Sequence, residues 1–139
     1  MSRIGKLKVT EKVISTQYPD TEFYVDINFV SMDKLSSIRN RALVMKFNTR
    51  TREREETVDN DKFLEEYAKV IVKGWKGLDI KTLSKILAVD AAEEDPAEII
   101  PYSQDEAVDL LQNSPNFLSF ITDTLNDFEK FGAIRKEDN

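Results

Sequence analysis

The feature that most restricts the fold is a run of alternating side chains near the N-terminus. Its apolar members are Phe23, Val25, Ile27 and Phe29. A period of two places such a set on one face of a β-strand. Upstream, Leu7, Val9 and Val13 stand among lysines, and the turn-forming sequence Tyr18-Pro19-Asp20-Thr21 separates the two segments. We therefore expect an antiparallel β-hairpin over residues 6–15 and 22–30.

After this run the period changes to that of a helix. Ser31 is a typical N-cap, and Asp33 would lie in the first turn. Leu35, Ile38, Ala42 and Met45 follow at spacings of three and four. The stretch 43–47 also alternates, so it is either the end of this helix or a strand that pairs with residues 54–58. We favour the second hairpin.

Four further helices are expected from caps and apolar stripes. One begins at Asp59 and would end at Gly74-Trp75-Lys76-Gly77, and a short one follows Asp79 over residues 80–89. The Ser103-x-x-Glu106 capping box and the Ser114-Pro115 pair begin the last two. One face of the final helix carries Phe117, Ile121, Leu125 and Phe128.

These elements predict one α+β domain, mostly α-helical, in which an N-terminal antiparallel β-hairpin packs on a bundle of four to five helices. Residues 1–58 would form a β-rich part with one helix, and residues 59–89 would be helical. Residues 90–102 contain five acidic and no basic side chains, which predicts an acidic surface linker. Residues 103–139 would supply the C-terminal helices and a polar tail.

The chain has 139 residues, with no Cys and no His. Disulfides are therefore impossible, and zinc, haem, Ser-His-Asp and Cys-His sites lack their usual residues. The acidic run 93–98 could bind Mg²⁺ or Ca²⁺ but lacks the order of an EF-hand loop, so we interpret it as solvated. No carboxylate pair stands out for catalysis. We expect no enzyme activity, no cofactor, no metal site and no membrane span.

Charge is distributed unevenly along the chain. The net charge is −6, but residues 1–88 carry +4 and residues 89–139 carry −10. The two parts could attract each other within one domain, or unlike patches could join separate molecules. We expect homo-oligomers, head-to-tail and weakened by salt. The basic cluster between Arg39 and Arg54 could contact phosphates, but interleaved glutamates favour a solvated or partner-facing loop without nucleic acid.

Candidate binding residues are mostly aromatic. The single Trp75, between two glycines, is either a core anchor or a binding hot spot. The aromatic residues of the last helix cover a broad arc of its surface. Either this arc faces both the core and a binding partner, or the helix is buried on most sides. The residues that we predict to bind a partner are Trp75, Tyr102, Leu111, Phe117, Phe120 and Phe131.

The order of several motifs resembles the tail assembly chaperones of long-tailed (siphovirus-type) bacteriophages. The most specific pair is Gly74-Trp75-Lys76-Gly77-Leu78 followed by the block from Pro101-Tyr102-Ser103 through Ala107 to Leu110-Leu111. Ser31–Leu35, Asp61–Tyr67, Asn113-Ser114-Pro115-x-Phe117 and Asp127-x-x-x-Phe131 complete the series. The resemblance covers about residues 23–131.

The resemblance implies a non-enzymatic role in the host bacterial cytoplasm. Such proteins bind the helical tape measure protein, help recruit tail tube subunits, and are absent from the mature virion. Many also exist in a longer frameshifted form whose extension contacts the tail tube protein. The alternative from a different class is a small acidic regulatory protein or DNA mimic, with residues 90–109 as the acidic face for a basic protein partner.

Overall fold

The structure is a computed structural model that describes residues 2–7 and 10–127. A short 3-10 turn, η1 (Ile4–Lys6), precedes strand β1 (Lys12–Gln17), which pairs antiparallel with β2 (Tyr24–Phe29). The predicted N-terminal hairpin is therefore present, but its first strand begins six residues later than expected. Phe23, Val25 and Ile27 are fully buried, as the alternation predicted.

The sheet has a third strand that the sequence did not predict. Helix α2 (Asn60–Ile71) ends before the glycines, and β5 (Val72–Lys76) follows at once and pairs antiparallel with β2. The strand order is β1-β2-β5. Residues 59–89 are thus not only helical, and the strands are interleaved with helices instead of forming only an N-terminal hairpin. The β-branched pair Ile71-Val72 is fully buried and suits this change from helix to strand.

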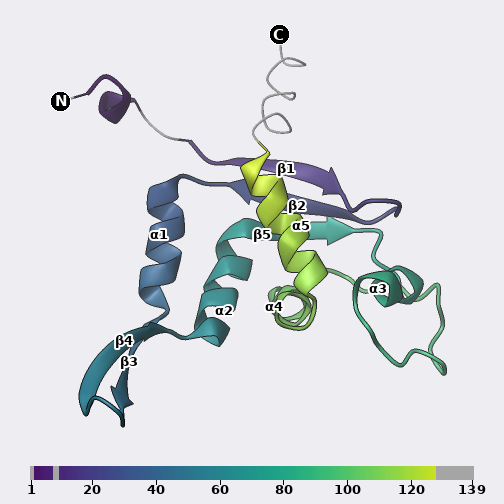
Figure 1. Cartoon of the computed structure of the whole chain (residues 1–139). Helices are drawn as coiled ribbons and strands as arrows, with labels where there is room; N and C mark the ends of the chain where they lie inside the picture. The colour runs from purple at the N-terminus through teal and green to yellow at the C-terminus, as the bar shows by residue number, and fades with distance from the viewer. Residues whose placement is uncertain (1, 8–9, 128–139) are drawn as a thin grey trace.

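Between β2 and α2 lie one helix and a second hairpin. Helix α1 (Met32–Arg41) begins at Ser31, whose hydroxyl accepts from the backbone N–H of Lys34. Strands β3 (Leu43–Asn48) and β4 (Glu53–Val58) then pair antiparallel, so the second hairpin is confirmed. It extends away from the three-stranded sheet and its helices (Figure 1) and makes no extensive contact with another element of the described chain.

The remaining helices begin at the predicted caps. Asp59 caps α2, and Asp79 caps α3 (Ile80–Ile86). Ser103 caps α4 (Gln104–Asn113), and Ser114 caps α5 (Pro115–Asn126). Each cap accepts a backbone N–H with a side-chain oxygen, which satisfies donors that a helix leaves open at its start. Local chemistry therefore sets where these helices begin.

The acidic segment 90–102 is tied to the strand and helix beside it. Ile80 N–H donates to Glu98 O, Lys81 N–H to Pro96 O, and Ile100 N–H to Leu78 O, all at 2.8–3.0 Å. Its five acidic side chains are nevertheless exposed, as expected of a solvated segment. It forms a loop beside α3 at the opposite end of the molecule from the β3–β4 hairpin (Figure 1).

Candidate functional site

A row of ring contacts connects four of the six predicted binding residues. Tyr102 lies 5.2 Å from Trp75, and Phe23 lies 5.7 Å from Trp75 in an edge-on arrangement, measured between ring centroids. Phe23 also stacks on Phe117 at 6.1 Å, and Phe117 lies 6.3 Å from Phe120. The row includes Phe23, a residue that we assigned only to a strand. Because the row crosses the core, its first role is to stabilise the fold.

Trp75 and Tyr102 are partly buried, and their polar atoms have backbone partners. The Trp75 indole N–H donates to Ile100 O at 3.0 Å, and the Tyr102 hydroxyl donates to Val72 O at 2.7 Å. Burial raises the pKa of the Tyr102 hydroxyl. These two bonds fasten the segment before α4 onto β5. Any partner at this site would therefore meet ring faces and edges, because the polar atoms are already used.

The other predicted residues fall into three environments. Leu111 and Phe117 are buried in the core. Phe120 is partly buried and lies 4.8 Å from the Tyr18 ring, and Phe131 lies outside the described residues. The structure therefore brings Trp75, Tyr102, Phe117 and Phe120 into one row, and Leu111 contributes elsewhere.

The largest apolar depressions lie on a different face of α5 from Phe120. One, of about 460 Å³, lies among α1, α2 and α5, and a neighbouring one of about 500 Å³ lies among α2, α4 and α5. They share Phe63 and Leu118, so we treat them as one surface and call it the groove. Its other apolar residues are Met32, Leu35, Ile38, Leu64, Tyr67, Leu111, Pro115 and Leu125.

Each helix contributes to the groove with one stripe of its surface. On α5, Leu118 and Leu125 are seven residues apart and therefore lie on one face, whereas Phe120 points about 160° away from Leu118 at ~100° per residue. On α1, the first residue, Met32, is 75% exposed and lines the groove. The sequence signal for this part of the groove was Leu118, seven residues before Leu125, a residue that we had assigned to the face of Phe117 and Ile121.

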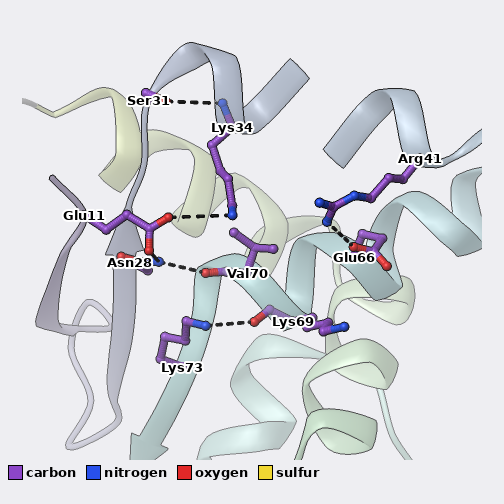
Figure 2. A network of polar contacts seen from close by, with 9 residues as sticks. All are labelled: Glu11, Asn28, Ser31, Lys34, Arg41, Glu66, Lys69, Val70 and Lys73. Atoms are coloured by element: carbon purple, nitrogen blue, oxygen red, sulfur yellow. Dashed lines mark hydrogen bonds and ion pairs between the residues drawn. The ribbon is translucent and has the colours of Figure 1, made fainter. Parts of the chain in front are cut away.

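Two surface ion pairs link α1 to neighbouring segments beside this groove. Figure 2 shows an ion pair between Arg41 Nη1 and Glu66 Oε2 at 3.2 Å, which joins α1 to α2. It also shows the Lys34 ammonium 3.9 Å from a Glu11 carboxylate oxygen. Inside the groove, burial raises the pKa of Tyr67, whose ring lies 5.6 Å from Phe63. Tyr67 therefore stays uncharged at neutral pH, and the charged side chains that line the groove are Arg39 and Asp61.

No group of three or more Asp, Glu, Cys or His side chains in the described part of the chain is placed to hold a metal ion. Within residues 2–7 and 10–127, no helix combines the length and the apolar character needed to cross a bilayer. What the geometry offers is apolar surface between helices, suited to binding another chain.

Comparison with curated proteins and with solved structures finds no match. The model of one protein family, described as YdaY prophage protein, matches residues 31–139. The match begins at the Ser31 cap, so among the described elements it includes helices α1 to α5, the β3–β4 hairpin, strand β5 and the groove, and it leaves out η1 and the N-terminal hairpin. This chain therefore belongs to the YdaY prophage protein family.

Proposed function

We propose that this protein is a tail assembly chaperone that binds an amphipathic helix of a phage tape measure protein in the groove, which we therefore call the client groove. The observation that carries the proposal is the groove itself, an apolar surface shared by four helices. A helix that lays its apolar stripe into such a groove is a common mode of peptide recognition. Membership in a prophage family and the motif order described above support a role in phage assembly.

The groove suits a helical client better than a small molecule. It is open along its length, and its walls carry aliphatic and aromatic side chains from α1, α2, α4 and α5. A tape measure chain presents long amphipathic helices whose exposed apolar stripes would otherwise aggregate. Covering such a stripe keeps the chain soluble without catalysis, cofactor or metal. We place this role in the host bacterial cytoplasm, before the tail tube protein assembles around the tape measure protein.

The test is co-expression with the tape measure protein encoded by the same prophage, measuring how much of it stays soluble. Met32→Glu puts a charge into the groove at an exposed position, so it should reduce the soluble tape measure protein to the level without a chaperone. Ile4→Glu is the matched control, because Ile4 is 78% exposed and lies outside the groove. It should solubilise the client as well as the parent does.

Phe120→Ser distinguishes the two faces of α5. If the client binds in the groove, this variant keeps its chaperone activity. If Phe120→Ser loses activity while Met32→Glu retains it, the client binds on the Tyr18–Phe120 side and the groove assignment is wrong. Circular dichroism of each variant separates loss of binding from loss of fold.

A second candidate function is binding to a basic protein through an acidic face. The observation in its favour is that the acids of the loop 90–98 are all exposed and lie near the acidic first turn of α4. Such a protein would act as a small acidic regulator or DNA mimic. A stable complex with a basic DNA-binding protein, together with no effect on tape measure solubility, would favour this function over the chaperone.

A further inference from the structure

The β3–β4 hairpin, residues 43–58, is a protrusion with an exposed apolar face, and we call it the arm. Met45 is 57% exposed and Phe47 is 62% exposed. A two-stranded hairpin alone in water is marginally stable. A large aromatic side chain that stays in contact with water contributes no burial free energy to it. An exposed ring on such an element is typical of an interaction surface.

The arm combines this ring with positive charge. Phe47 is the direct cross-strand partner of Arg54, so the phenyl ring and the guanidinium project from the same face. Lys46, Arg50 and Arg52 lie around the same end of the arm, and all three are exposed. Three exposed glutamates of β4, Glu53, Glu55 and Glu56, offset most of this charge, so the arm presents an aromatic anchor with Arg54 directly beside it.

The opposite end of the molecule carries a pocket with the complementary character. The pocket has a volume of about 90 Å³, room for several water molecules. Its apolar walls include Trp75, Leu83, Leu87 and Leu110, and two acids of α4, Glu106 and Asp109, lie at its edge. We call it the Trp75 pocket.

The surroundings of the Trp75 pocket strengthen the match. The indole N–H of Trp75 is already bonded to Ile100 O, so a visiting side chain meets the apolar part of the ring. Both Glu106 and Asp109 are exposed, one turn apart on α4. The acidic loop 90–98 follows α3, another wall of the pocket. An apolar side chain with a cation next to it would therefore contact the apolar walls of the pocket and the acids at its edge.

We propose that the arm of one molecule binds a second copy of this chain, with Phe47 in the Trp75 pocket and Arg54 beside Glu106 and Asp109. The arm and α3 lie at opposite ends of the molecule (Figure 1), so a molecule cannot fill its own pocket. The contact joins two different surfaces, which makes it heterologous and lets copies add in a row. This interface does not use the client groove, and it stands independently of the proposed chaperone function.

Two knock-out variants test the contact. Phe47→Ser removes the anchor but keeps the pocket, and Asp109→Arg makes the edge of the pocket basic but keeps the arm. Both positions are exposed, so both variants should fold. In sedimentation velocity at low salt, the parent should form dimers and larger species as its concentration rises. Each variant alone should associate at least tenfold more weakly.

The decisive measurement is the mixture of the two variants. Phe47→Ser offers only a pocket and Asp109→Arg offers only an arm, so an equimolar mixture should form a one-to-one dimer and nothing larger. An interface between two arms or between two pockets would not be restored by mixing. A mixture that stays monomeric, or a parent that is monomeric at every concentration at low salt, overturns the proposal.

A charge exchange provides an independent test. Arg54→Glu should weaken association at least tenfold, and adding Asp109→Arg to the same chain should restore it. Lys46→Glu is the matched control, because Lys46 pairs with Glu55 on the other face of the arm. It should associate as the parent does. Equal loss in Lys46→Glu and Arg54→Glu would show that only total charge matters, which contradicts the assigned contact.

Discussion

Asn28 in strand β2 donates its side-chain amide to the backbone carbonyl of Val70, 3.1 Å away, near the end of α2 (Figure 2). The last carbonyls of a helix have no partner within the helix, so this bond satisfies one of them. The same amide nitrogen lies 3.2 Å from a Glu11 carboxylate oxygen. Beside it, the register of β2 and β5 shifts between Asp26 and Ile27. Asn28 thus fixes the point at which α2 becomes β5.

Asn28→Asp should destabilise the fold strongly. A carboxylate at this buried position would face the Val70 carbonyl and the Glu11 carboxylate, with no donor for either. Asn28→Ala, which only removes the donor, should cost about 1–3 kcal/mol, and Asn28→Asp should cost more. Urea unfolding measures both, with the exposed Asn40→Ala in α1 as control. An Asn28→Asp variant as stable as the parent would refute this role.

Gly77→Ala should destabilise through the backbone. Gly77 has a φ of +78°, and a Cβ there would overlap the backbone oxygen of Glu22. Both the left-handed conformation and the steric overlap penalise alanine, so we expect a loss of about 2 kcal/mol or more. Gly5→Ala is the control, since its Cβ would meet only the Ser2 hydroxyl, at 3.0 Å. Thermal unfolding compares the two, and equal melting temperatures would contradict the prediction.

The elements that the sequence predicted correctly are those governed by neighbouring residues. Ser31, Asp59, Asp79, Ser103 and Ser114 all cap helices, and the alternation at 23–29 gave the buried strand. Strand β5 was missed because its evidence is not local. The glycines after Val72 are typical of a helix end, and only pairing with β2, over 40 residues earlier, makes the segment a strand.

The candidate surfaces were harder to predict for a related reason. The client groove needs Met32, Phe63 and Leu118 side by side, and these come from three helices whose packing the sequence does not specify. Phe117 was predicted to bind a partner because the last helix is rich in aromatic residues, but its side chain is buried in the core. Trp75 could be named as a candidate from the sequence because a single tryptophan between two glycines is a local signal. Whether it binds a partner stays a prediction.

Ser114→Ala should lower the free energy of unfolding by more than the loss of a solvent-exposed helix cap does. The Ser114 hydroxyl accepts from Phe117 N–H at 3.1 Å and donates to Ile86 O at 2.8 Å, and the residue is buried. Alanine would leave both backbone groups without this partner in the core, so we expect a loss of about 2–3 kcal/mol. Ser103→Ala, an exposed cap, should cost about 1 kcal/mol in the same urea experiment. Equal costs would show that the Ile86 bond contributes nothing.

Asp79 should make the end of the molecule that carries α3 sensitive to acid. Hydrogen bonds from the Thr82 side chain, and then from its backbone N–H, hold the pKa of the Asp79 carboxyl below its ordinary value of 3.8. These bonds favour the charged form in the folded state. A carboxyl whose pKa is lower when folded contributes stability above its unfolded pKa. That contribution is lost as the pH falls through the folded pKa.

Carboxyl chemical shifts followed by NMR should therefore give a titration midpoint for Asp79 below 3.8. Thr82→Val removes the hydroxyl donor but keeps the backbone N–H, so the midpoint should rise toward the ordinary value without reaching it. Asp79→Asn keeps a capping oxygen that does not titrate, so the amide signals of α3 should lose this acid transition. Because Ile80 N–H donates to Glu98 O, the loop should respond together with the helix. A midpoint at or above 3.8 in the parent would disprove the role of Thr82, because a carboxylate stabilised by two donors must release its proton more readily than a solvated one.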